Sequence, residues 1–215
     1  ARFLTQRSGA VVPMLLGILG TAMIRPHVTV LLAAAVMVAV AFRPVGDQAM
    51  GVLGKVGALL VVGVAVAILA TQSAEFLGID DLDPEAISGS IEWAGGQTEQ
   101  GGSAFEPVPL TNPLGVPAAV VTQLFRPFQW EVTSLPMLLQ SLEGAFMVWL
   151  IWWRRASLWA LPRFLRKNAF VTFAAVYALG YIIAFAGFGN FGIVARQRTL
   201  MVPFALLLLA LPTRK

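Results

Sequence analysis

Five basic side chains flank apolar runs in this sequence, and their types make them the first candidates for chemistry. Arginine presents a planar fork of N–H donors that binds phosphate or carboxylate in a bidentate manner and stays protonated. A ring of such groups at a membrane surface suits a pyrophosphate or an acidic sugar on a lipid carrier. Each base could instead reach lipid headgroups or pair with an acid. The five residues are Arg25, His27, Arg126, Arg196 and Arg198.

Two residues are candidates for proton transfer. Glu143 lies about eight residues inside the apolar run Leu135–Trp153, where a lipid-facing charge costs roughly 2.5–3.5 kcal/mol. It is therefore a functional carboxylate, the counter-ion of Arg25 or Arg196, or half of a structural pair that fixes the rotation of its helix. His27 is the sole histidine and titrates near neutral pH, so it is a candidate general base, although a lone histidine at a helix junction is more often structural.

The segment Leu124–Glu131 places Arg126 among three aromatic residues, just before a spanning run. Aromatic rings here would anchor the chain at headgroup depth. The same segment could hold a sugar by stacking on Trp130 while Arg126 holds a phosphate. The two roles are compatible.

Composition places the chain among membrane proteins. It is 58% hydrophobic and 12% charged, whereas a soluble domain carries about 25% charged residues. The absence of cysteine excludes disulfides and thiolate chemistry, and a single histidine excludes a multi-histidine metal centre. The acids of 80–85 have no EF-hand spacing and are expected to be a solvated helix start. We predict no metal, no cofactor and no nucleic-acid partner.

The apolar pattern predicts an all-α, polytopic membrane helix bundle with about six transmembrane helices and one large extracytoplasmic loop. Residues 1–72 and 132–215 form the two membrane segments, and residues 73–131 form the loop, which holds nine of the eleven acids. Residues 118–125 are too short to span and are expected to be re-entrant or interfacial. The six runs are Ser8–Ile24, Val28–Phe42, Val56–Ala74, Leu135–Trp153, Ala169–Gly187 and Ile193–Pro212.

The charge pattern sets the expected topology. Arg154–Lys167 carries five bases and no acid, and it follows Trp149, Trp152 and Trp153, as expected of a cytoplasmic flank beside an aromatic belt. Counting from this segment puts both termini in the cytoplasm and the loop outside a bacterial inner membrane. The five candidate bases then lie outside, where the positive-inside rule does not favour them.

Arg196 and Arg198 precede an apolar stretch, 199–212, that gives only about 21 Å of helix, so a full span would draw both arginines into the outer leaflet. Two residues apart on a helix, they point about 200° from each other. At most one therefore faces a common site, unless Gly192 and Pro203 make the chain irregular there.

The order of these features resembles the bacterial envelope polysaccharide polymerases and O-antigen ligases, or the later half of one. The residues that carry the resemblance are Ile24-Arg25-Pro26-His27 between apolar runs, the long outer loop, and Asn190–Arg198 leading into Pro203. The resemblance implies a many-helix fold whose outward-facing arginines engage a lipid-linked pyrophosphate sugar. This chain has six runs where that family has about twice as many.

Three functions remain open. The first is handling of lipid-linked glycans at the outer face, in its enzyme form a metal-independent glycosyl transfer in which arginines hold the pyrophosphate and His27 or a carboxylate deprotonates the acceptor. The second is a non-catalytic or accessory subunit of a larger membrane complex. The third is a transporter lined by Glu143 and the arginines, against which the lack of internal repeats argues. Expected partners are membrane lipids, a polyprenyl-pyrophosphate-linked glycan and other membrane subunits.

Overall fold

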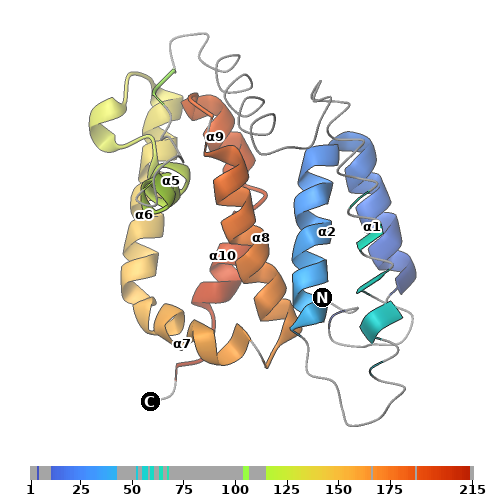
Figure 1. Cartoon of the computed structure of the whole chain (residues 1–215). Helices are drawn as coiled ribbons and strands as arrows, with labels where there is room; N and C mark the ends of the chain where they lie inside the picture. The colour runs from blue at the N-terminus through green and yellow to red at the C-terminus, as the bar shows by residue number, and fades with distance from the viewer. Residues whose placement is uncertain are drawn as a thin grey trace. The chain divides into compact units, whose positions relative to one another are not determined.

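The computed structural model describes residues 11–42, 104–106, 115–165, 167–186 and 188–213, with Leu4 and several single positions between 52 and 67. In these residues every regular element is a helix, so the predicted all-α class is confirmed there. One isolated bridge joins Ala104 to Asn190. The elements, labelled as in Figure 1, are α1 (Val11–Ile24), α2 (Pro26–Ala41), α5 (Gly115–Phe125), the 3-10 turn η1 (Gln129–Glu131), α6 (Leu135–Trp153), α7 (Arg155–Leu165), α8 (Ala169–Phe185), α9 (Phe191–Arg198) and α10 (Val202–Leu209).

One helix among the described residues, α6, is long and apolar enough to cross a membrane. Two bent helix pairs, α7 with α8 and α9 with α10, raise the number to three if each pair is one span. Helices α1 and α2 are apolar but shorter. Only some positions of the predicted third run are described, and those are helical. Most of the predicted loop, including the acids of 80–85, lies outside the described residues.

The chain divides into two compact units, which we describe separately. The first comprises residues 1–82 and 160–180, and the second comprises residues 83–159 and 181–215. In the first unit α1 and α2 lie side by side (Figure 1). The chain reverses at Arg25, whose non-helical backbone (φ −145°, ψ 77°) follows from the proline after it, because Pro26 disfavours a helical conformation in the preceding residue. One residue, Arg25, thus separates α1 from α2.

In the second unit α5 packs against both α6 and α9. The buried residues of α6 are Met137, Ser141, Gly144 and Met147, whose spacing of three and four places them on one face. Gly144 permits the closest approach, because a Cβ atom there would overlap the carbonyl oxygen of Phe125 at the end of α5. Because Gly144 has no side chain, the end of α5 can approach α6 this closely.

The sixth predicted run is not one continuous helix. It is broken between α9 and α10, whose axes are bent by 56°. Pro203 lies in the first turn of α10, where a missing N–H is tolerated, and it cannot continue the preceding helix because of its ring. At the other end of α9, the Asn190 side chain accepts hydrogen bonds from the N–H groups of Gly192 (3.0 Å) and Ile193 (3.3 Å), a standard N-cap.

The ends of α6 and α10 are joined through one arginine. Arg154 donates from Nε to the carbonyl of Leu209 (2.9 Å) and from Nη2 to that of Leu211 (3.2 Å). Ser157 Oγ donates to the same Leu211 carbonyl at 2.9 Å. A cation at the C-terminal carbonyls of a helix satisfies acceptors that lack partners within the helix and complements its dipole. The C-terminal ends of α6 and α10 therefore lie at the same end of this unit.

The contact at Gly144 predicts that Gly144→Ala destabilises the protein by about 1–3 kcal/mol, because the added methyl group meets backbone that cannot rotate away. The matched control is Gly17→Ala in α1, where a new Cβ meets nothing within 4 Å. That change should be neutral or stabilising by up to about 1 kcal/mol. Unfolding of each purified variant in mixed micelles measures both effects, and equal stability of the two variants would contradict the packing assignment.

Candidate functional site

Arg198, the last residue of α9, carries the least exposed guanidinium described. It is 1% exposed, because it lies on the buried face of α9 with Phe191, Val194 and Ala195. Its Nη2 donates a hydrogen bond to the carbonyl oxygen of Arg126. Its Nε and Nη1 are buried without a hydrogen-bond partner within the described part of the chain. A buried cation with two unbonded donors is costly, so this side chain is the natural centre of a site for an oxyanion.

Glu143 on α6 is the acid that acts electrostatically on Arg198. Its side chain is exposed, and no hydrogen bond or ion pair at contact distance joins the two among the described residues. The carboxylate therefore offsets part of the arginine charge without occupying the two unbonded N–H groups. Among the roles predicted for Glu143 is that of counter-ion to Arg25 or Arg196, which stays a prediction; the charge of Glu143 acts on Arg198 as well.

Two further polar atoms of α6 lack partners in the described residues. They are Gln140 Oε1 and Ser141 Oγ, both buried. Gln129 Nε2 reaches the backbone carbonyl of Ser141 at 3.4 Å, so the hydroxyl itself stays unbonded. Buried polar groups in folded proteins are nearly always hydrogen-bonded. Unpartnered donors on α9 and unpartnered polar atoms on α6 thus lie on two helices that contact each other.

Arg126 is held firmly by its surroundings. Its Nε and Nη2 donate to Glu131 Oε1 at 2.9 and 2.6 Å, and its Nη1 reaches the carbonyl of Glu106 at 3.5 Å. The guanidinium lies 4.3 Å from the ring centroid of Phe105 and within 6 Å of the Phe128 and Phe191 rings, which adds cation–π attraction. The predicted phosphate-binding role of Arg126 thus competes with an acid five residues away.

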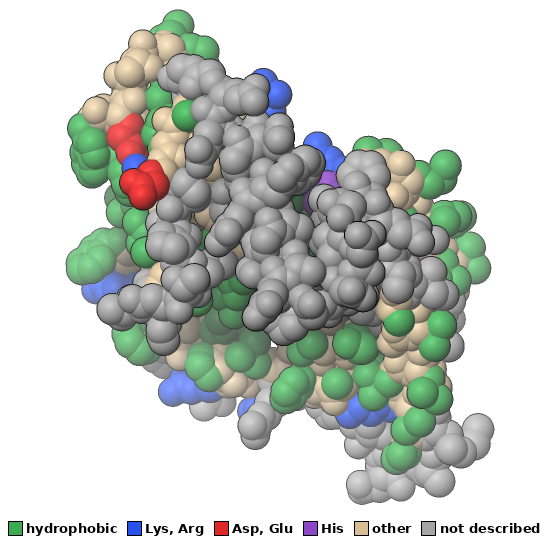
Figure 2. Space-filling model, turned by 45° about the horizontal axis from the view of Figure 1, so that its top comes forward, with side chains coloured by type: hydrophobic (Ala, Val, Ile, Leu, Met, Phe, Trp, Pro, Cys, Tyr) green, Lys and Arg blue, Asp and Glu red, His purple; other side chains and the backbone are tan. Residues whose placement is uncertain are grey.

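Three separated segments converge around Arg126. Phe105 stacks on Phe191 with centroids 4.6 Å apart, and its N–H donates to the Gly189 carbonyl at 2.7 Å. Glu131 also accepts from the Phe128 N–H at 2.8 Å, which closes the turn η1. In Figure 2 the visible acidic side chains gather at one place beside a basic side chain. The segments joined are 104–106, 126–131 and 189–198.

Of the remaining predicted site residues, Arg196 and Trp130 belong to the second unit, and Arg25 and His27 belong to the first. Arg196 is exposed on the side of α9 opposite the buried Arg198, so the predicted opposite orientation is confirmed. Trp130 is 78% exposed and stacks on Phe128 at 4.7 Å, so its outer face is open to a ligand or to lipid. Arg25 and His27 belong to the first unit, where the Arg25 charge acts on His27 and on Tyr177.

Some residues of the site carry no recognisable signal in the sequence. Phe105 and Phe191 stack across 86 positions of the chain, and nothing in either local segment identifies the other. The sequence gives only a weak indication that Ser141 is buried: it lies three residues before Gly144, so both are on the packed face of α6. Groups of three or more potential metal-ligating side chains are absent from the described residues. Comparison of the chain with protein-family models, with curated proteins and with solved structures finds no match.

The pairing of Arg126 with Glu131 predicts a measurable coupling. A double-mutant cycle with Arg126→Gln and Glu131→Gln should give a coupling free energy of roughly 1 kcal/mol, the upper end for partly exposed pairs. The control cycle combines Arg126→Gln with Glu106→Gln, because Glu106 contacts Arg126 through its backbone carbonyl only. Its coupling should be close to zero. Equal coupling in the two cycles, measured by unfolding in mixed micelles, would contradict the specific pair.

Proposed function

We propose that this chain is an integral membrane protein of a bacterial cell envelope that handles lipid-linked glycans at the outer face of the inner membrane. The single observation that carries the proposal is the buried Arg198 guanidinium with two unbonded donors. A pyrophosphate offers oxygens in the planar spacing that an arginine fork matches. The resemblance of the Asn190–Arg198 segment to polysaccharide polymerases and O-antigen ligases supports the same ligand class.

The proposed topology has six membrane segments, cytoplasmic termini and an outer loop. The link from Arg154 to the end of α10 supports it. If the basic segment after α6 is cytoplasmic, the end of α10 lies on the cytoplasmic side too, as a C-terminus inside requires. Arg126 precedes α6 and Arg198 precedes α10, so both belong to the opposite, outer end of these helices.

In this function the residues of the second unit have different roles in binding the lipid-linked glycan. Arg198 donates Nε and Nη1 to pyrophosphate oxygens. Arg126, neutralised by Glu131, positions Arg198 through its backbone carbonyl and keeps the Phe105 ring in place. The exposed Trp130 ring supplies an apolar face for a sugar. Arg196 faces away from these groups and contributes charge at a distance.

The enzyme form of the proposal is glycosyl transfer to an acceptor hydroxyl. The acceptor oxygen bonds to the anomeric carbon while the bond from that carbon to the phosphate oxygen breaks. The leaving lipid pyrophosphate takes the electron pair, and Arg198 stabilises its growing charge. The hydroxyl proton passes to Glu143, whose carboxylate is exposed and acts as the general base.

A second candidate function is a non-catalytic subunit of a larger membrane complex. The observation that favours it is the neutralisation of Arg126 by Glu131, because a paired guanidinium offers little to a substrate. In that case Arg198 holds structure together, and the exposed apolar face of α6 contacts a partner helix.

Binding of the lipid anion separates these candidates. Arg198→Lys keeps the positive charge but replaces the planar fork with a compact ammonium, so the purified full chain should bind a polyprenyl pyrophosphate at least about tenfold more weakly. Arg196→Lys is the matched control, with the same change at an exposed position on the same helix, and should stay within about twofold. Fluorescence competition in detergent measures both. Equal affinities of wild type and Arg198→Lys would contradict the site.

The length distribution of envelope polysaccharide in the source bacterium tests the enzyme form. Replacement of Glu143 by Gln, or of Arg198 by Lys, should shorten or abolish the chains at normal protein level. Unchanged glycans together with weakened binding would indicate the subunit, and unchanged glycans with unchanged binding would contradict glycan handling altogether.

A further inference from the structure

Helix α7 (Arg155–Leu165) presents an exposed basic and aromatic face, of which Arg155 contacts the carbonyl (3.0 Å) and the ring of Trp152. Arg155, Trp159 and Arg163 are all exposed, and their spacing of four residues places them along one face. Trp159 is 83% exposed, which is unusual for so large an apolar ring. The opposite face holds the buried Ser157 and Ala160. Helix α7 therefore packs through small residues and turns its large cationic and aromatic side chains outward.

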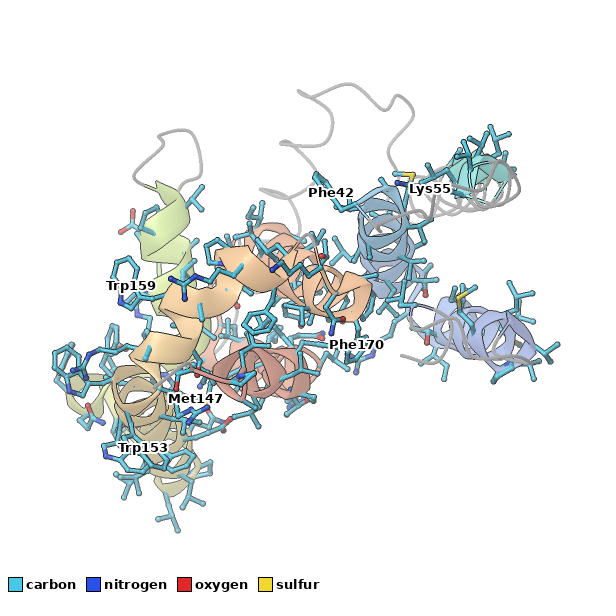
Figure 3. The ribbon with its side chains drawn as sticks, turned by 90° about the horizontal axis from the view of Figure 1, so that it is seen from below. Phe42, Lys55, Met147, Trp153, Trp159 and Phe170 are labelled. Carbon is cyan, nitrogen blue, oxygen red and sulfur yellow. The ribbon has the colours of Figure 1, made fainter. Side chains whose placement is uncertain are left out.

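The neighbourhood of α7 is that of a membrane surface. Helix α6, which is long and apolar enough to span, ends with Trp149, Trp152 and Trp153, all exposed. In Figure 3 the Trp153 and Trp159 side chains extend away from their helices, whereas Met147 is buried. Tryptophan prefers the headgroup region of a bilayer. Helix α7 begins two residues after this belt and is bent by 117° from α8, so it does not prolong that helix.

The charge on this face lacks a partner in the described protein. Residues 154–167 contain five bases and no acid. Arg154 is turned inward to the carbonyls of Leu209 and Leu211, so it does not contribute to the surface. Arg155 lies 4.6 Å from the Trp152 ring centroid, and no acid pairs with Arg155, Arg163 or Lys167 among the described residues. Within the described residues the charges of these three side chains are therefore not neutralised by an acid.

We propose that the exposed face of α7 is a binding site for anionic phospholipid headgroups. Arg155 and Arg163 are eight residues apart, or about 12 Å along the helix, so each contacts a different headgroup phosphate. The Trp159 ring lies between them at the level of the glycerol backbone, with its polar edge toward water. The site is independent of the glycan-handling proposal, because it uses none of the residues around Arg198.

Equilibrium binding of fluorescent phosphatidylglycerol to the detergent-solubilised full chain tests this site. Removing both charges with Arg155→Gln and Arg163→Gln should weaken binding roughly 20-fold or more, because each juxtamembrane base contributes about fivefold. The double change to Lys keeps the charge and should stay within about threefold of wild type. Phosphatidylcholine should bind much more weakly than phosphatidylglycerol, and 0.5 M NaCl should reduce the difference.

Two controls make the test specific. Arg163→Gln and Arg196→Gln each remove one exposed arginine, so a purely global charge effect would weaken binding equally in both, and equality would overturn the site. Soluble glycerol phosphate should not compete, and competition would assign the face to a free phosphate instead. Unchanged affinity in the double Gln variant would also overturn the proposal. The single Arg163→Gln variant, at an exposed position, keeps the test valid if the double variant fails to fold.

Discussion

The hydrogen bond from the buried Arg198 guanidinium to the Arg126 carbonyl is the contact on which the second unit depends. Arg126 follows the last residue of α5, and a carbonyl oxygen at a helix end receives no hydrogen bond from an N–H group of the same helix. The Arg198 side chain is only 1% exposed. This hydrogen bond gives the Arg126 carbonyl a donor and gives one N–H group of Arg198 an acceptor. It also joins the end of α9 to the end of α5. Helix α5 is fixed from the other side by Gly144 of α6.

Because the site depends on this hydrogen bond, the three segments that form it are hard to recognise from their own sequences. Residues 104–106 contribute one ring and one backbone N–H, and η1 contributes a carboxylate that is used on both of its oxygens. Neither piece forms a recognisable motif. The segment 189–198 has the strongest local signal, because Asn190 caps the helix that carries Arg198. The arrangement becomes specific only when Arg198 joins the three.

Sequence patterning was sufficient where a single local rule decides the structure. The predicted run Leu135–Trp153 has the bounds of α6, because apolar composition and flanking tryptophans and arginines define it without help from other segments. The opposite directions of Arg196 and Arg198 followed from helical geometry. The break between α9 and α10 was not predicted, because the apolar run Ile193–Pro212 indicates one helix, although Pro203 is a source of irregularity.

The sequence alone could not select a partner where that choice depends on tertiary structure. The sequence offers Arg126 nine acids in the interval 73–131, and the acid it binds is selected by the turn η1, which carries Glu131 back over the preceding residues. Likewise, the charge of Glu143 acts on Arg198, because α6 and α9 contact each other. A rule based on charge alone does not single out either pair.

Among the described residues Arg126 pairs with an acid and Arg198 does not, and this difference has a consequence for the proposed function. Arg126 and Glu131 form a neutral pair, so the attraction for an anion at this end of the unit comes mainly from Arg198. In the resting protein Glu143 offsets that attraction without a direct hydrogen bond. A pyrophosphate carries more charge than one carboxylate and can occupy Nε and Nη1 directly, so it would displace the influence of Glu143 on Arg198.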